Sequence, residues 1–359
     1  MATIGVFQHW GLGDLVMTVP VLSELRRLNP SACIILMVRG KAQASLMEDS
    51  PLIDEVLQVP PNTDLAGLMR FFAALRSRHF DAVYVATRIT PLVPLLLRFI
   101  SGVRTIIGDA DRFGFLYTHR NSLDPTVHRV DRMLKTLSIW TGCSVEKPAF
   151  DLPVAEAARL SAKARLAASG LADARYFAFH PGSSRGPGIE KRVPIPLVRG
   201  VIEALRMRDP EMRFVVMLGP DDMDLVPQFE AFPADVVLIS GSSLDETKAI
   251  LSRAIGFLGS DSALGHIAAS WGVPTITAVG PTNPNETRPW GALSHVIASR
   301  EELACRPCWF TPLKGHCPHD RRCMTGITVE QIMDDVSLLP PVAGVPVHST
   351  VMVSTSEKL

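Results

Sequence analysis

Residues 256–279 read GFLGSDSALGHIAASWGVPTITAV and carry the clearest signature of the architecture of this chain. The apolar run 256–259 is typical of a buried strand, and the polar residues 260–262 follow it directly. Small and apolar residues at 263–271 indicate a helix, which a glycine ends before a second apolar run at 274–279. A strand, a helix and a second strand in this order predict a parallel βαβ unit.

The same alternation of apolar runs and helical spacings extends through the rest of the chain. Residues 15–28 have the spacing of a helix face, and Pro20 inside them predicts a kink or a late helix start. Strands separated by helices predict an α/β fold with two Rossmann-like, doubly wound domains that face a cleft. The other predicted strands are 3–7, 34–38, 56–59 and 81–87 in the first half and 177–180, 213–218 and 236–240 in the second.

The length of the chain suits this organisation. Its 359 residues are too many for one typical core and allow two domains of ~150 residues each. We predict an N-terminal domain over 1–152 and a C-terminal domain over 153–335. Residues 336–359 are rich in Pro, Val, Ser and Thr without a helical period, and are predicted to form a flexible tail.

Charge and hydropathy argue against two classes of protein. Lys+Arg and Asp+Glu each number 36, so a zero net charge gives no overall attraction for nucleic acid. No apolar stretch reaches the roughly 18 residues that a transmembrane helix needs. The N-terminus also lacks the basic and apolar regions of a signal peptide. We therefore expect a cytoplasmic protein.

The first polar motif is Gly11-Leu12-Gly13-Asp14, directly after the first strand. Its glycines allow a tight turn and close approach of a ligand. The third glycine of a dinucleotide fingerprint is replaced by Val16, which argues against NAD. Asp14 would stand at the carboxyl end of a strand, where open α/β sheets bind ligands. It is a candidate general base, or alternatively only a helix cap.

The second motif, His180-Pro181-Gly182-Ser183-Ser184, follows the first strand of the second half. Its backbone N–H groups and the hydroxyls of Ser183 and Ser184 suit phosphate oxygens. Lys191 follows a Gly- and Pro-rich stretch and is a candidate to neutralise a diphosphate leaving group. The alternative is that Lys191 belongs to a solvated basic pair.

The third motif is GSDSALGH at residues 259–266, where the first predicted strand of the βαβ unit meets its helix. The helix that starts after Ser262 would attract an anion through its free N–H groups and its dipole. Asp261 is predicted either to cap that helix or to accept hydroxyls of a ribose or sugar. His266 faces either the ligand or the core. Thr282 lies in a polar loop after the next strand, at the same edge of the sheet.

Four cysteines gather near the C-terminal end at Cys305, Cys308, Cys317 and Cys323. A CxxC pair lets two thiolates reach one ion, and four sulfurs complete a closed tetrahedral site. In a cytosolic protein such a cluster indicates a metal before a disulfide. The sequence leaves two alternatives open, a structural zinc or iron ion and a reduced cluster without metal.

These motifs together resemble glycosyltransferase family 9, which contains the bacterial heptosyltransferases. The resemblance spans about residues 3–335 and rests on four segments in the family's order. The GSDSALGH segment is the most specific, and the cysteines that end in Cys323-Met324 are also similar to those of many members. The segments are GLGDLVMTVP at 11–20, the loop 180–192, GSDSALGH at 259–266 and VGPT at 279–282.

The resemblance implies a GT-B fold, with the acceptor bound by the first domain and the nucleotide sugar by the second. It implies inverting transfer, typically of heptose from an ADP-heptose donor, to a lipopolysaccharide core or another bacterial glycan or protein acceptor. Asp14 matches the catalytic base and Lys191 the lysine near the donor phosphates, so catalysis needs no metal. The donor-binding candidates are Gly13, Ser183, Ser184, Asp261, Ser262, Ala263, Leu264, His266 and Thr282.

A lipid-linked acceptor would bring the enzyme to the inner face of the inner membrane. Phe71-Phe72 and the stretch 91–100, with Arg104 and Arg112, are predicted to form an apolar face rimmed by basic side chains. The alternative is that both apolar stretches are ordinary helices packed on the first sheet.

Two other functions remain open on the sequence. A GT-B-fold sugar-nucleotide epimerase would use the same donor cleft without an acceptor. A non-catalytic binding or assembly protein would use Asp14 only as a cap.

Overall fold

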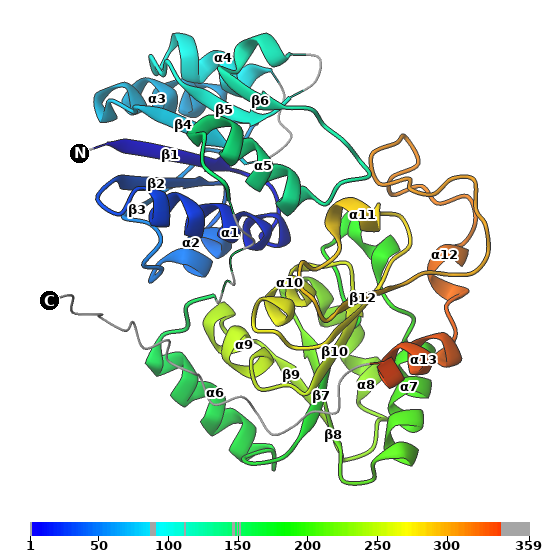
Figure 1. The fold of residues 1–359 in the computed structure, drawn as a ribbon. Coiled ribbons are helices and arrows are strands. Elements are labelled where there is room, and N and C mark those ends of the chain that lie inside the picture. Colours follow the sequence, from blue (N-terminus) through cyan, green and yellow to red (C-terminus); the bar gives the residue numbers. More distant parts are fainter. Residues whose placement is uncertain are drawn as a thin grey trace, which may run out of the picture.

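The computed structural model describes residues 2–86, 91–110, 113–145, 148, 150 and 152–338. It contains two α/β domains, one above the other in Figure 1, each built on a six-stranded parallel sheet. Nearly all of the predicted tail at 336–359 and Arg112 lie outside the described residues. The predicted domain boundary at 152/153 lies between Thr141, where α5 ends, and Glu156, where α6 begins, and its exact position stays a prediction.

Both sheets have the same strand order. The first runs β3-β2-β1-β4-β5-β6 and the second β9-β8-β7-β10-β11-β12. In each sheet the direction of winding reverses next to the first strand, between β1 and β4 and between β7 and β10. Ligands of such sheets bind at the carboxyl ends of the strands beside this reversal. The topology therefore marks the loops after β1, β7 and β10 as the place for a site.

The first domain begins with β1 and the long helix α1. Helix α1 continues through Pro20 and starts at Leu12, so the predicted late start is wrong. The elements of this domain are β1 (Thr3–Gln8), α1 (Leu12–Leu28), β2 (Cys33–Val38), α2 (Lys41–Met47), β3 (Glu55–Gln58), α3 (Leu65–Leu75), η1 (Arg76–Arg78), β4 (Ala82–Val85), α4 (Leu92–Phe99), β5 (Ile106–Asp109), η2 (Gly114–Leu116), β6 (His119–Asn121) and α5 (Arg129–Thr141).

The second domain begins with α6, and all its predicted strands are present. The strand β12 was not predicted, nor were β5 and β6. The elements are α6 (Glu156–Ala168), β7 (Tyr176–His180), η3 (Gly186–Lys191), α7 (Ile195–Arg208), β8 (Arg213–Leu218), η4 (Pro220–Leu225), α8 (Val226–Phe229), β9 (Val236–Ser240), α9 (Leu244–Leu251), β10 (Gly256–Ser260), α10 (Ala263–Ser270), β11 (Thr275–Ala278), α11 (Pro284–Thr287), β12 (Ser294–Ile297), α12 (Arg322–Thr325) and α13 (Val329–Leu338).

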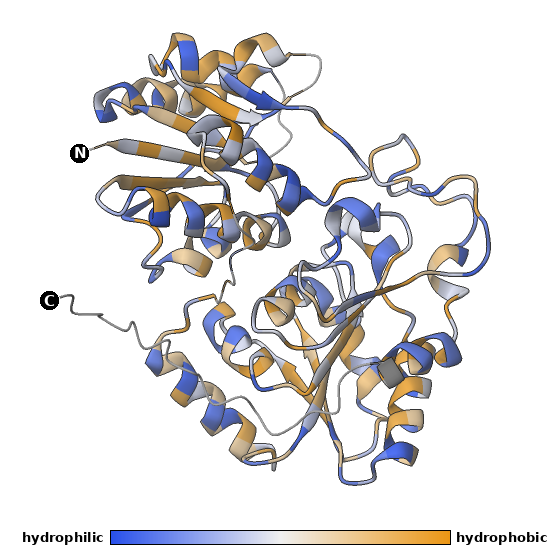
Figure 2. Ribbon diagram, in the orientation of Figure 1, coloured by the Kyte–Doolittle hydropathy of each residue, from blue (hydrophilic) through white to orange (hydrophobic). Residues whose placement is uncertain are grey.

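The apolar residues of the strands form the cores. In Figure 2 many strands are orange, whereas the surrounding helices alternate between orange and blue. Helices that cover both faces of a parallel sheet bury the side chains of its inner strands on both faces. This explains why β1, β2 and β7 read as continuous apolar runs.

Polar contacts join the domains beside the cleft. His128, which precedes α5, donates its Nε2–H to the carbonyl of Arg288 at 2.8 Å. Arg132 of α5 lies 3.4 Å from the Glu286 carboxylate of α11, and both side chains are buried. The helices α1 and α10 also pack together across the domains. The two halves of the site are therefore held in contact.

The described part of the chain contains no helix long and apolar enough to cross a membrane.

Candidate active site

A cavity of about 630 Å³ lies between the domains, at the carboxyl ends of the strands that the topology marks. Loops of both domains line it. The structure brings every predicted catalytic and donor-binding residue to its wall: Gly13, Asp14, Ser183, Ser184, Lys191, Asp261, Ser262, Ala263, Leu264, His266 and Thr282.

Asp14 lies in the first turn of α1 and has two partners. Its Oδ2 accepts the N–H of Gly11 at 3.2 Å, and its Oδ1 forms an ion pair with Arg129 of α5. The carboxylate therefore does cap the helix, as one of the two alternatives predicted. A carboxylate has about four acceptor positions, so these contacts leave room for a proton from a ligand. Capping and general-base function are compatible here.

Opposing influences set the pKa of Asp14. Burial raises the pKa above its ordinary value, and the negative charge of Asp261 adds to this rise. Arg129, the Gly11 N–H and Lys191 act in the opposite direction. The influence of Asp261 and Lys191, both in the second domain, shows that the charges of the two domains meet at this carboxylate.

Gly13 also has a role that was not predicted. Neither Gly11 nor Gly13 has a positive φ. A Cβ atom on Gly13 would lie 3.0 Å from Cδ2 of His266 and 3.6 Å from Cα of Ala263. Gly13 therefore allows α1 to approach α10 closely. His266, whose pKa burial lowers to about 4, is a neutral ring in this interdomain contact as well as part of the cavity wall.

The loop after β7 is held from behind by Asp222. The carboxylate of Asp222 accepts the N–H of Ser183 at 2.9 Å and the N–H of Gly219 at 3.2 Å. Arg192 lies 3.3 Å from the same carboxylate. The Ser183 N–H is thus already used and is not available to a phosphate. The exposed Ser184 remains free to present its hydroxyl to a ligand.

Lys191 ends the turn η3, and its ammonium reaches the strand-end loop of β10. Its Nζ donates to the Asp261 carbonyl at 2.6 Å and stands 4.7 Å from the centroid of the Trp309 ring. An ammonium has three donors, so these contacts leave N–H groups for an anionic ligand. The alternative of a fully solvated basic pair is wrong, because Lys191 is half-buried and Arg192 is buried.

The start of α10 offers unpaired polar groups. Ser262, not Asp261, is the N-cap residue, and its side chain does not cap the helix. Among the residues that the structure describes, the buried hydroxyls of Ser262 and Thr282 have no hydrogen-bond partner. Buried hydroxyls are normally paired, so two unpaired ones on a cavity wall beside a helix N-terminus indicate a polar ligand.

Comparison with known proteins identifies the family. The model of "Glycosyltransferase family 9 (heptosyltransferase)" matches residues 68–312. The chain belongs to glycosyltransferase family 9. It is therefore a glycosyltransferase of the heptosyltransferase family, and the resemblance of the sequence motifs is confirmed.

Individual relatives agree with this assignment. The chain is 25% identical over 300 residues to lipopolysaccharide heptosyltransferase 3 of Escherichia coli, covering 77% of this chain and 83% of that protein. A family 9 glycosyltransferase structure from Veillonella parvula has a TM-score of 0.79 at 22% identity, covering 94% and 96% of the chains. The E. coli heptosyltransferase WaaC with ADP-2-deoxy-2-fluoro heptose has a TM-score of 0.69 at 18% identity, covering 94% and 99%. The predicted GT-B fold is confirmed.

The chain contains two Asp-x-Asp sequences, at 109–111 and 222–224, and each has two carboxylates of the kind that binds metal ions. Asp222 and Asp224 both pair with Arg192, at 3.3 and 2.5 Å, so neither is free to chelate an ion in this conformation. Asp109 pairs with Arg132 at 2.7 Å, and Asp111 lies outside the described residues.

The cavity wall also contains residues that were not predicted, among them four with aromatic or cationic side chains. Trp10 and Arg129 come from the first domain, and Trp309 and Phe310 come from the cysteine-rich segment of the second. Arg129 lies over the Trp10 ring, 5.7 Å from its centroid, and Trp10 contacts Phe310 at a ring distance of 5.9 Å. Trp309 and Phe310 directly follow the CxxC pair, and these aromatic residues were the sequence signal from which this part of the cavity wall could have been predicted.

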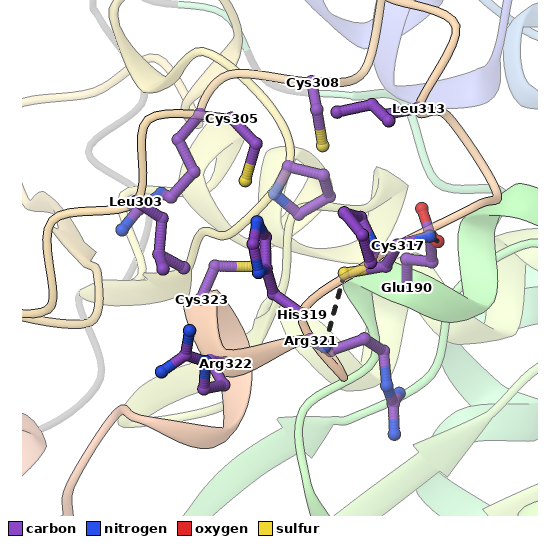
Figure 3. Close-up of a pocket in the computed structure, with 13 residues that line it drawn as sticks. Glu190, Leu303, Cys305, Cys308, Leu313, Cys317, His319, Arg321, Arg322 and Cys323 are labelled. Carbon is purple, nitrogen blue, oxygen red and sulfur yellow. Dashed lines mark hydrogen bonds between the residues drawn. The ribbon is translucent and has the colours of Figure 1, made fainter.

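The four cysteines line one small cavity, in which Figure 3 shows their sulfur atoms facing a common space. The N–H of Arg321 donates to Sγ of Cys317 at 3.4 Å. Burial raises the pKa of Cys323 to about 11, and the neighbouring sulfurs add to this rise. Within the described residues, no three Cys, His, Asp or Glu side chains already stand in a metal-coordinating arrangement.

Proposed function

We propose that this chain transfers a heptose from an ADP-heptose donor to a bacterial glycan, with inversion at the anomeric carbon and Asp14 as general base. The observation that carries the proposal is the single cavity where Asp14 of one domain meets Lys191 of the other. The E. coli WaaC complex with an ADP-heptose analogue supports the donor class. The relative named lipopolysaccharide heptosyltransferase 3 supports a lipopolysaccharide core as acceptor.

The proposed reaction is one displacement. The acceptor hydroxyl attacks the anomeric carbon while Asp14 takes its proton, and the bond from that carbon to the diphosphate oxygen breaks. Negative charge then grows on the departing ADP. Lys191, the Ser184 hydroxyl and the N-terminus of α10 at Ser262 stabilise this charge where it develops. These groups carry the charge without a metal ion.

The proposal is tested first by donor choice. Purified chain is screened with ADP-heptose, ADP-glucose, UDP-glucose and GDP-mannose, since a ligand that binds only the folded state raises its unfolding temperature. We expect the largest shift with ADP-heptose, and transfer to a heptose-deficient lipopolysaccharide core with inverted anomeric configuration by NMR. Consumption of donor without any acceptor would instead support the epimerase alternative.

We propose that Cys305, Cys308, Cys317 and Cys323 hold one structural zinc or iron ion. Four sulfurs that line one cavity are a donor set both metals accept, and four protein ligands leave no open position for catalysis. The Arg321 N–H that donates to Sγ of Cys317 is the kind of contact that stabilises a thiolate ligand. Burial is the main cause of the raised pKa values of Cys308 and Cys323, and repulsion from the neighbouring sulfurs adds to it, so a bound cation would favour the thiolate forms.

Removal of one ligand should release the ion. For Cys317→Ser we expect the bound metal, measured by elemental mass spectrometry, to fall from about one ion per chain to near zero. The unfolding temperature should fall by roughly 5 °C or more. The matched control is Cys143→Ser, which changes an exposed cysteine outside the cluster and should retain the metal. Wild-type protein purified without chelators that contains neither zinc nor iron would contradict the site.

We propose that the first domain touches an anionic membrane surface through α4 and the turn η2. Arg98 of α4 donates to the Leu116 carbonyl at 3.1 Å, which places the two elements side by side. Arg104, which follows α4 in the chain, is exposed. The predicted contribution of Phe72 is wrong, because that side chain is buried in the core. The exposed apolar side chains are instead Leu92, Leu95, Phe99, Phe113 and Phe115.

The membrane contact should depend on two exposed aromatic rings. Phe99 and Phe115 are 69% and 77% exposed, and each ring buried in a bilayer interface contributes about 1.5–3 kcal/mol. We expect Phe99→Ser and Phe115→Ser each to weaken co-sedimentation with anionic vesicles roughly 10- to 100-fold. Binding should also weaken at high salt. Met207→Ser, which changes an 81% exposed residue in the second domain, is the control. No wild-type binding to anionic vesicles at low salt would reject this surface.

A further inference from the structure

The cysteine-rich segment 303–323, called here the cysteine strap, does more than gather four sulfurs. It connects β12 to α12 and is the orange loop beside α11 in Figure 1. Its residues Trp309 and Phe310 reach the wall of the cavity between the domains. The strap is therefore part of the proposed active site as well as the candidate metal site.

Hydrogen bonds fix the strap to the segments that carry donor-site residues. The N–H groups of Cys308 and Trp309 both donate to the carbonyl of Pro281, next to Thr282, at 2.9 Å. The Glu190 carboxylate accepts the N–H groups of Gly315 at 2.9 Å and of Cys317 at 2.8 Å. Glu190 directly precedes Lys191, so the strap is bonded to the chain on either side of the donor site.

Trp309 contacts Lys191, the residue that the proposed function places at the leaving group. Its ring lies 4.7 Å from the Lys191 ammonium, which also donates to the Asp261 carbonyl at 2.6 Å. A lysine side chain has about 2 kcal/mol of rotamer entropy, and a flexible lysine would have to be ordered when the donor binds. A cation–π contact contributes about 0.5–2 kcal/mol and holds the ammonium in place beforehand.

We propose that Trp309 is a positioning residue that holds the Lys191 ammonium against the donor diphosphate. The inference rests on the proposed function, in which Lys191 faces the leaving group, and goes beyond it by assigning a role to the strap. Trp309 acts through Lys191 and not by contact with the reacting atoms. The strap thereby links the fold of the cysteine cluster to the charge that receives the leaving ADP.

A double-mutant cycle tests this proposal. The variants are Trp309→Leu, Lys191→Ala and both together, read by ADP affinity in calorimetry and by kcat and KM for transfer. Trp309→Leu should weaken ADP binding and kcat/KM roughly 3- to 30-fold. In the Lys191→Ala background the same change should have less than about a twofold effect, because its partner is absent. Trp309→Phe, which keeps a π face, should recover most of the loss.

The matched control is Lys314→Ala. Lys314 is exposed and lies 4.4 Å from the same ring, outside the cavity wall, so its loss should leave ADP affinity within about twofold of wild type. Additive effects of Trp309→Leu and Lys191→Ala, or an equal loss in Lys314→Ala, would overturn the proposal. Failure of the proposed function is distinguishable, because the wild-type chain would then not bind ADP. The cycle would in that case be read with the nucleoside diphosphate that it does bind.

Discussion

Asp14→Asn is expected to lower kcat by roughly 100- to 10,000-fold, the range that follows removal of a general base. The amide has nearly the shape of the carboxylate but cannot take a proton from an acceptor hydroxyl. Its oxygen can still accept the Gly11 N–H, so the cap on α1 is kept while the base is lost. The measurement is steady-state transfer kinetics together with ADP affinity, which should change little.

The control for Asp14→Asn is Asp49→Asn, which removes an exposed carboxylate away from the cavity. Circular dichroism and thermal unfolding should show that both variants are folded. A folded, ADP-binding Asp14→Asn protein with a kcat within tenfold of wild type would remove Asp14 from the role of base. The cap alone would then explain its position.

The pH profile provides an independent signature of the same carboxylate. A base works only when it is deprotonated, so kcat/KM should fall as the pH falls through the pKa of Asp14. Burial raises that pKa, which places the acidic limb above the ordinary aspartate range. Arg129 opposes the rise, so Arg129→Gln should move the limb to higher pH, whereas Arg129→Lys keeps the positive charge and should move it less.

The sequence predicted the strands that are continuous runs of apolar residues. The runs that became β2, β7 and β8 are buried on both faces, and burial on both faces is what produces an uninterrupted apolar sequence. The strands that were missed are short or polar. β6 consists of His119–Asn121, and β12 begins with Ser294 and His295. Such segments become strands because they pair with an adjacent strand of the sheet. The pattern of their own residues does not indicate this pairing.

The candidate site was predictable where a residue lies in the loop or helix start that follows a strand. Asp14 lies in the first turn of the helix that follows β1, and Asp261 directly follows β10, so topology alone places each at the carboxyl edge of its own sheet. Arg129 and Trp309 reach the same cavity from distant segments, and only the packing of the two domains brings them there. The contact of Gly13 with α10 was not predicted for the same reason, because that helix belongs to the other domain.

Lys191→Ala is expected to lower kcat/KM roughly 100- to 1,000-fold, the effect of removing one group that stabilises developing charge. The loss should appear in kcat and also in ADP affinity, since the ammonium is close to the diphosphate before and after the bond breaks. Lys191→Arg keeps the charge but replaces a compact ammonium with a planar fork, so recovery should be partial.

A control variant separates the effect of Lys191 from a general loss of positive charge. Lys163→Ala removes an exposed lysine of α6, away from the cavity, and should leave kcat/KM and ADP affinity within about twofold of wild type.

Asp14→Asn and Lys191→Ala should differ in their effect on ADP affinity. The first should leave ADP affinity intact, whereas the second should weaken it, because only Lys191 reaches the donor side of the cavity through its bond to the Asp261 carbonyl. An unchanged ADP affinity in folded Lys191→Ala would place the leaving-group charge elsewhere on the cavity wall, with the Ser262 end of α10 as the remaining positive pole.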